Sequence, residues 1–428
     1  MYHQLSKQSV IVQKYGGTSV ESVEKIHKIA QRIARQYQSG MKKIVVVVSA
    51  MGKETNRLVG LTEALNDPID AASYDMVVSA GEQVSAGLMA AALKQDNIPA
   101  KPFLAHQLAI CTDSTHGSAQ IKSINISKIS ECWQQGIIPV VAGFQGIDTL
   151  GELTTLGRGG SDTTAATLAA FLNADLCEIN TDVEGVYSAD PNRVKGARLL
   201  KVLDYQVARE MAILGSRVLH PRCVEIGAKY NIPIVVRDTF SQEQRDYTLV
   251  HSGVKQACKN NVQVTSLSVD KNIARVVLAG LTSKQMAELF DQFVKVGVNV
   301  DVIVHERVEE EERTQVSFSV SMLDQLKVLT ILERTKLQPG YSVFNFVIEY
   351  ELAKVSVIGS GLLAQSAITA QLLQTLEQAD IEVYMLSSSE VKISCLVLKE
   401  EATIACQLLH DDLIKGRSNK RVIRAVAS

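Results

Sequence analysis

Short apolar runs alternate with helical stripes along the first half of the chain. The runs are SVIVQ, KIVVVVSA, IPAKPF, IIPVVAG, LCEINT and IPIVVR, and they recur between Ser9 and Arg237. After the first run, Val23, Ile26 and Ile33 fall on one face of a helix. Continuous apolar runs are typical of strands buried on both faces. Their alternation with helices predicts an α/β domain with a mostly parallel sheet.

The second half of the chain repeats one pattern. Residues 274–306 read as strand, turn, helix and strand, and residues 353–390 follow the same order. Another alternating strand and a helix come after each copy. This is the order of a ferredoxin-like βαββαβ plait written twice, and an interleaved arrangement of the two plaits is left open. The assigned ranges are 1–250 for the first domain, 251–262 for a linker, and 263–340 and 341–428 for the plaits.

Composition and charge exclude several classes of protein. The chain has 428 residues, 46% of them hydrophobic and 21% charged, which is ordinary for a globular protein of several domains. A formal net charge of −2 provides no overall field that would attract nucleic acid or anionic lipid. The 7 cysteines form no C-x-x-C pair, so neither a disulfide framework nor a zinc site is indicated. Without an apolar run of membrane-spanning length or a signal-like N-terminus, we expect a cytoplasmic protein.

Two glycine-rich loops follow strand-like runs and open helical segments. KYGGTSV begins at Lys14, and LGRGGSDTTA spans residues 156–165. Backbone N–H groups in such loops, together with a helix N-terminus, bind phosphate. The first loop carries Lys14 and the second carries Arg158 and Asp162, so both signs of charge are available. Tight turns and a surface lysine are the simpler alternative, but the combination favours a site of phosphoryl transfer.

The motifs together resemble those of the aspartate kinase (aspartokinase) family of amino-acid kinases. KYGGTSV, SAGEQVSAG, VAGFQG, TTLGRGGSDTTA, TDVEGVYSADP and GSRVLHP occur in the family's order and spacing, and the plaits resemble its two ACT domains. The resemblance implies a three-layer αβα kinase domain followed by the ACT pair. It also implies transfer of the ATP γ-phosphoryl group to the β-carboxylate of L-aspartate to give 4-phospho-L-aspartate, the first step of lysine, threonine and methionine biosynthesis. Magnesium would arrive with ATP.

The resemblance further implies roles for single residues. Lys14 would follow the migrating phosphoryl group, and Asp162 would orient Lys14 or the magnesium. Arg158 would bind the α-carboxylate of aspartate and Glu82 its ammonium group. The other implied contacts are Thr55 and Ser161 for the substrate, and Lys14, Tyr15, Gly16, Gly17, Gly159, Gly160, Thr181, Asp182, Tyr187, Arg193 and Arg217 for the nucleotide. No residue is assigned to a metal.

Simpler roles compete with some of these. Glu82 would offset a helix N-terminus, Ser161 or Asp162 would cap a helix, and Thr55 would be an exposed loop threonine. The chemistry itself requires little of the protein. A substrate carboxylate is already ionised at pH 7, so no general base is needed and catalysis rests on positioning and charge.

The chain departs from the family pattern beside the nucleotide. Asn192 replaces the arginine that usually follows ADP, with Arg193 one place later, and Arg217 stands where a lysine is usual. These changes favour one rival interpretation, a catalytically weak amino-acid sensor that works through its ACT domains. A second rival is another amino-acid kinase. VSVIGSGLLAQ also matches a dinucleotide fingerprint, but too few residues follow it, and we interpret it as the first turn of a plait.

The regulatory turns also depart from the family. The segments at 281–288 and 359–367 lack the Asp-x-Pro-Gly-like turn in which ACT domains bind an effector carboxylate, and His305 and Glu306 replace a Gln-Asn pair. Ser387 remains as one of three serines that could offer hydroxyl groups. We therefore expect weak or absent inhibition by lysine and threonine. Plaits commonly pair edge to edge, so a homodimer is the smallest assembly expected.

Overall fold

The computed structural model describes residues 6–65, 69–215, 218–241, 246–253, 263–308, 313–363 and 366–416. The chain divides into two compact units, which are described separately. Unit 1 comprises Met1–Val186 and Leu199–Ala257, and unit 2 comprises Tyr187–Arg198 and Cys258–Ser428. Most of the assigned linker, and the acidic run 309–312, lie outside the described residues.

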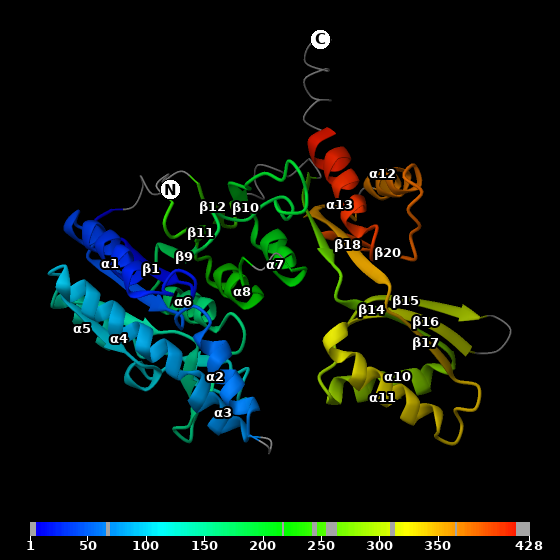
Figure 1. The fold of residues 1–428 in the computed structure, drawn as a ribbon, viewed down its shortest axis with the longest axis horizontal. Helices are drawn as coiled ribbons and strands as arrows, with labels where there is room; N and C mark the ends of the chain where they lie inside the picture. The colour runs from blue at the N-terminus through cyan, green and yellow to red at the C-terminus, as the bar shows by residue number, and fades with distance from the viewer. Residues whose placement is uncertain are drawn as a thin grey trace, which may run out of the picture. The chain divides into compact units, whose positions relative to one another are not determined.

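Unit 1 is built on a mostly parallel sheet, as the alternating pattern predicts (Figure 1). The strand order is β10-β12-β11-β9-β1-β2-β6-β3, and the pair β11 and β12 is antiparallel while the other neighbours are parallel. The strands are β1 Val10–Tyr15, β2 Lys43–Val48, β3 Ala100–Phe103, β6 Ile138–Ala142, β9 Leu176–Thr181, β10 Val202–Leu203, β11 Ile234–Asp238 and β12 Thr248–Val250.

A second, small sheet in unit 1 has no counterpart in the sequence prediction. Its order is β5-β4-β7-β8, and its strands are too short to show a period. They are β4 Cys111–Thr112, β5 Ile121–Ser123, β7 Gln145–Ile147 and β8 Leu153–Thr155. Because β8 leads directly into the loop at Leu156, this sheet carries one of the two glycine loops.

Helices cover both faces of the large sheet. On one face, Ile29 of α1 and Leu93 of α4 pack with Val46 of β2 in a core whose members are almost completely buried. On the other, α6 and α8 pack together beside β1 and β9 (Figure 1). The helices of unit 1 are α1 Val23–Gln38, α2 Glu54–Glu63, α3 Ala71–Val78, α4 Ala80–Gln95, α5 Ser127–Gln134, α6 Gly160–Phe171, α7 Tyr205–Ile213 and α8 Pro221–Tyr230.

One helical stretch of the described chain is long and apolar enough to cross a membrane by length and composition. It spans Ala71–Gln95, and 56% of its most apolar window is buried inside the unit. Burial of this kind is what a core helix of a globular domain shows.

Unit 2 contains two sheets, each covered by a pair of helices. The sheet orders are β15-β16-β14-β17 and β13-β18-β20-β19. The elements are β13 Gln263–Asp270, β14 Ile273–Leu281, α10 Ser283–Lys295, β15 Val300–Val308, β16 Arg313–Ser321, α11 Gln325–Lys336, β17 Asn345–Glu349, β18 Leu352–Ser360, α12 Ser366–Glu377, β19 Met385–Ser388, β20 Lys392–Leu398 and α13 Ala402–His410.

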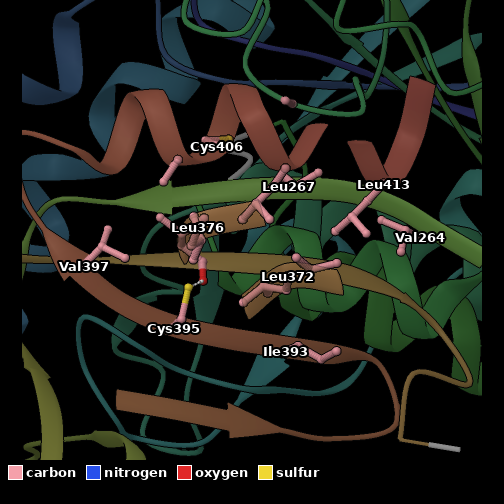
Figure 2. Packing of buried hydrophobic residues seen from close by; sticks show 14 of the residues in the cluster. Val264, Leu267, Leu372, Leu376, Ile393, Cys395, Val397, Cys406 and Leu413 are labelled. Carbon is pink, nitrogen blue, oxygen red and sulfur yellow. Dashed lines mark hydrogen bonds between the residues drawn. The ribbon is translucent and has the colours of Figure 1, made fainter. Parts of the chain in front are cut away.

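The two plaits interleave. Strand β13 precedes the whole first plait in the chain, yet it pairs antiparallel with β18 of the second. Figure 2 shows Leu267 of β13 in one cluster with Leu376 of α12 and Cys406 of α13. This position of β13 is favourable because the strand pairs with the otherwise open edge of β18 and buries the apolar side chains of this cluster.

The segment Tyr187–Arg198 belongs to unit 2, although its sequence lies inside the range assigned to the first domain. The Leu267 N–H donates to the Ser188 carbonyl at 2.8 Å. The Ser188 hydroxyl and His410 Nε2 are 2.9 Å apart. Val194 lies in the same apolar cluster as Leu267. The residues of β13 and α13 that contact this segment lie more than seventy positions away in the sequence, so no local pattern could indicate these contacts.

Candidate active site

Lys14 and Asp162 form an ion pair at the carboxyl edge of the large sheet. Lys14 lies within β1, where it pairs with Val47 on one side and Ile179 on the other. Its Nζ is 2.5 Å from Oδ1 of Asp162, which lies in the first turn of α6. Both side chains are only 11% exposed. The alternative of a surface lysine is therefore wrong.

Helix α6 begins without a side-chain cap. Its N-cap residue is Gly159, which has a φ of 65°, in the left-handed region. Neither Ser161 nor Asp162 caps the helix, so the capping alternative does not describe them. Ser161 is buried directly beneath Gly143, where an added Cβ would lie 2.7 Å from its side chain. The Gly160 N–H donates to the Gly157 carbonyl at 2.9 Å, so the N–H groups of Ser161 and Asp162 are the ones that can receive an anion beside Lys14.

The first glycine loop packs closely against the loop that follows β2. A Cβ on Gly17 would lie 2.9 Å from the Ala50 carbonyl oxygen. The Gly16 N–H donates to the Asn180 carbonyl at 3.0 Å. The two glycines therefore serve a close approach of backbone segments at the ends of β1, β2 and β9, and not merely a turn.

Glu82 is a buried carboxyl group with one oxygen unpartnered. It lies in the first turn of α4 and is 4% exposed. Its Oε1 accepts a 3.0 Å hydrogen bond from the Ala50 N–H, while Oε2 has no hydrogen-bond partner among the residues that the structure describes. Burial raises the pKa of Glu82 to about 7, against the opposing charge of Lys14. A buried, unpartnered carboxylate oxygen suits a ligand that brings its own N–H donors and positive charge.

The remaining substrate candidates are placed less tightly. Arg158 is exposed and makes no hydrogen bond or ion pair among the described residues. Thr55 is half-buried in the first turn of α2, so it is not a loop residue. Arg158 is thus free to take a ligand, but the structure does not bring it into contact with Lys14 or Glu82.

The predicted nucleotide residues are divided between the two units. Thr181 ends β9, and its hydroxyl donates to Asp182 at 3.1 Å. Thr239 joins this strand end to the first glycine loop, because its Oγ1 contacts the Thr181 carbonyl at 2.9 Å and Ser19 Oγ at 2.6 Å. Tyr187 belongs to unit 2.

Two arginines complete this set. Arg193 also belongs to unit 2, where its Nε is 3.3 Å from Asp190 Oδ2 and its side chain is about half exposed. Arg217 lies outside the described residues.

Sequence reasoning missed three side chains around the second glycine loop. A Cβ on Gly159 would meet the His220 ring at 2.3 Å, and burial lowers the pKa of His220. Arg222 donates to the Leu156 carbonyl at 3.2 Å. Asp75 accepts from the Thr155 N–H at 2.9 Å. The motif GSRVLHP contains His220 and could have indicated it. No local sequence pattern indicates Asp75.

Within the described part of the chain, no group of three or more His, Cys, Asp or Glu side chains could hold a metal ion. Magnesium needs few protein ligands when phosphate and water supply the rest. Asp162 supplies a carboxylate at the helix N-terminus.

Comparison with known proteins identifies the family. A model of the amino acid kinase family matches residues 9–238, and an ACT domain model matches residues 355–413. The chain is 40% identical over 404 residues to aspartokinase 2 of Bacillus subtilis, covering 94% of this chain and 97% of that protein. It is 39% identical over 404 residues to the aspartokinase of Geobacillus stearothermophilus, covering 94% and 96%.

A solved structure is similar over nearly the same length. Aspartokinase III of E. coli, in complex with aspartate and ADP, superposes with a TM-score of 0.77 at 25% identity, covering 94% of this chain and 99% of that one. The comparisons do not favour the weak-sensor interpretation or another amino-acid kinase. The chain therefore belongs to the aspartokinase family, the ATP-dependent kinases that phosphorylate the β-carboxylate of L-aspartate.

Proposed function

We propose that this chain catalyses aspartate phosphorylation through positioning and charge neutralisation, with Lys14 and Asp162 at the reacting centre and without a general base. The observation that carries the proposal is the Lys14–Asp162 ion pair of 2.5 Å, set between two glycine loops at the end of β1. A buried cation beside backbone N–H groups matches the charge that develops on a phosphoryl group in transit.

Lys14 acts on the transferring group, and Asp162 holds the lysine in place. The lysine Nζ is a compact charge on a flexible stem, so it can stay with the phosphoryl group as that group moves. Magnesium, when bound with ATP, neutralises the phosphate oxygens. Asp162 lies where it could share in holding that ion, because it stands at the N-terminus of α6 beside Lys14.

The substrate is recognised at its two charged ends. Glu82 binds the ammonium group of aspartate, because its Oε2 is buried and lacks a partner within the described part of the chain. Arg158 binds the α-carboxylate, since an exposed guanidinium offers two parallel N–H donors. Thr55 and Ser161 supply further contacts. The E. coli relative binds aspartate and ADP, which supports both ligands here.

The nucleotide contacts form the second pole of the site. Tyr15, Gly16, Gly17, Gly159 and Gly160 surround the phosphates, while Thr181 and Asp182 hold the ribose and base. Tyr187, Arg193 and Arg217 are assigned to the same ligand by resemblance. We further propose that the enzyme works in the cytoplasm as a homodimer or larger homo-oligomer through its ACT domains, where an amino acid could act as effector.

A hydroxamate assay tests the proposal. The protein is incubated with ATP, magnesium and L-aspartate, and the acyl phosphate is trapped by hydroxylamine. Aspartyl-hydroxamate should form in proportion to enzyme. N-acetylglutamate and glutamate serve as matched acceptors, and turnover of one of them in place of aspartate would contradict the assignment of the substrate.

A further inference from the structure

Asp75 is a fully buried carboxylate beside the second glycine loop, and the proposed function assigns it no role. It lies in α3, with 0% of its surface exposed. Its Oδ2 accepts from the Thr155 N–H at 2.9 Å, from the Gly117 N–H at 3.0 Å, and lies 2.9 Å from His116 Nδ1. Its Oδ1 accepts from the Thr155 hydroxyl at 2.5 Å and from Gly117 N–H at 3.1 Å. A charge buried this deeply is tolerated because donors surround it.

These donors come from two separate segments. Gly117 lies in the loop between β4 and β5, and Thr155 is the last residue of β8. The two segments touch each other, because the Ala119 N–H donates to the Thr155 carbonyl at 2.9 Å. A Cβ on Gly157 would lie 2.8 Å from the Gly117 carbonyl oxygen. Asp75 therefore joins two backbone segments at the start of the second glycine loop.

Arg222 holds the same two segments through their carbonyl groups. Its guanidinium, from α8, donates to Ser118 and Ala119 in one segment and to Leu156 in the other, at 3.2 to 3.3 Å. The carboxylate thus binds N–H groups and the guanidinium binds carbonyl groups of the same two segments, 117–119 and 155–156. Arg158 follows the second of these segments two positions later in the chain.

Arg158 needs a fixed backbone because its own side chain has no other support. It is exposed and makes no hydrogen bond within the described residues. A bidentate grip on a carboxylate depends on the placement of the guanidinium plane, and a misplacement of about 1 Å can cost on the order of 100-fold in rate. Loosening the loop at Thr155 would therefore reach the substrate through Arg158.

We propose that Asp75 is a positioning residue for aspartate recognition: it clamps the end of β8 and the loop at Gly117, and so sets the position of Arg158. The inference rests on the proposed role of Arg158 as the carboxylate-binding residue. Asp75 touches neither substrate nor nucleotide in this scheme, and its effect passes through the backbone.

Asp75→Asn is the first test, because it keeps the size of the side chain but replaces one acceptor oxygen by an NH2 donor. The KM for aspartate should rise about tenfold or more, while the KM for ATP stays within about twofold. Amide hydrogen exchange should accelerate in peptides covering residues 115–119 and 153–158. A purely structural role would instead lower the melting temperature and shift both KM values together, which would overturn the proposal.

Asp148→Asn is the matched control. Asp148 is also a buried carboxylate of this region, 5% exposed, and it accepts from Ser114 Oγ at 2.7 Å and from the N–H groups of Leu150 and Glu152. It organises the turn between β7 and β8 at the opposite end of β8 from Arg158. The KM for aspartate of this variant should remain that of the parent enzyme.

A gentler pair of variants covers the case in which Asp75→Asn does not fold. Thr155→Val removes the hydroxyl that donates to Asp75, and Thr155→Ser retains it. The valine variant should raise the KM for aspartate and the serine variant should restore it. Equal behaviour of the two would overturn the proposal.

Arg158→Ala separates failure of this inference from failure of the proposed site. If Arg158→Ala raises the KM for aspartate and Asp75→Asn does not, the clamp alone is refuted. If Arg158→Ala leaves the KM for aspartate unchanged, the proposed role of Arg158 falls, and the clamp loses its function with it.

Discussion

The charged residues of the site differ in their burial and in whether another side chain pairs with their charge. Lys14 and Asp162 are matched within an ion pair, whereas Glu82 is buried with one oxygen unpartnered. Arg158 is left to solvent. This division is what phosphoryl transfer to a carboxylate requires. A fixed cation stabilises the phosphoryl group as it moves, and charged side chains without a protein partner can bind the substrate.

Lys14→Ala should lower kcat by a factor on the order of 100 or more, with smaller changes in either KM, because the lysine charge acts mainly in the transition state. Steady-state kinetics with aspartate and ATP varied in turn measure this. Lys25→Ala is the control: this lysine follows the same loop, but it is 35% exposed and pairs with Glu21. An equal loss in both variants would refute the role of Lys14.

The activity of the free enzyme should depend on the ionisation of Glu82. Because burial raises its pKa to about 7, kcat/KM for aspartate should rise with pH through that region and level off above it, where the carboxylate can attract the substrate ammonium. Glu82→Gln should lower kcat/KM and remove this step. A step that persists in Glu82→Gln belongs to another group.

The same pKa shift has a consequence for stability. Between the ordinary carboxyl range and about pH 7, Glu82 binds more protons in the folded than in the unfolded chain. Its contribution to the free energy of unfolding therefore falls as pH rises through this window. The ionised form of Glu82, which predominates at high pH, therefore makes the folded chain less stable but binds the substrate ammonium more strongly.

At the scale of elements, the start of α6 depends on one glycine. Gly159 is left-handed, and its Cα faces the His220 ring at the start of α8. Helices α6 and α8 can approach there only because no side chain intervenes. The loop that precedes Gly159 is held in turn by Asp75 and Arg222, so several elements converge on it.

Gly159→Ala should lower the melting temperature and largely abolish activity. The left-handed backbone costs an alanine about 1–2 kcal/mol, and displacement of the His220 ring adds to this. Gly151→Ala is a control with a similar φ of 81° but no atom within 4 Å of the added Cβ. It should show the backbone cost alone in thermal unfolding and should retain activity.

At the scale of the whole molecule, a stretch of sequence inside the range assigned to the kinase domain belongs to unit 2, which contains the two plaits. Tyr187–Arg198 follows Thr181 and Asp182 within a few residues, yet it makes contacts with β13, α13 and the π-helical segment Asp411–Lys415. Lys195 N–H donates to Gln407 Oε1 at 2.7 Å, and Gln407 Nε2 donates back to the Lys195 carbonyl.

Ser188→Ala should destabilise unit 2 by about 1–3 kcal/mol, because it leaves Nε2 of the buried His410 without its partner. Burial lowers the pKa of His410, so the stability that depends on the neutral ring is lost as pH falls below the ordinary histidine range. Denaturant unfolding at pH 8 and pH 5.5 measures both effects. No loss at pH 8 would show that the serine contributes nothing.

Inhibition by lysine and threonine should be weak or absent. In the first plait, Thr282 and Gln285 form a capping box at the start of α10, with hydrogen bonds of 3.0 and 3.3 Å. Two backbone N–H groups of this turn, those of Thr282 and Gln285, are therefore occupied by side chains and less able to receive an effector carboxylate. Titration of each amino acid against initial rate tests this, and half-inhibition below the millimolar range would contradict it.

Much of the fold could be predicted from the chain alone, because period and glycine position are local signals. Runs such as KIVVVVSA predict buried parallel strands, and the two repeats predict the plaits. The motif order points to the family and to the residues proposed for the site. Strand β1 is longer than the apolar run suggests, since pairing on both sides carries it through Lys14 and Tyr15.

Only the tertiary structure decided which distant groups meet. Lys14 and Asp162 are 148 positions apart in the sequence, Asp75 and Thr155 are 80 apart, and Ser188 and His410 are 222 apart. Nothing in a local pattern specifies such pairs, because each depends on how strands order in a sheet and how helices pack upon it. β13 shows the same limit: neither repeated pattern includes it, and only its pairing with β18 assigns it to the second plait.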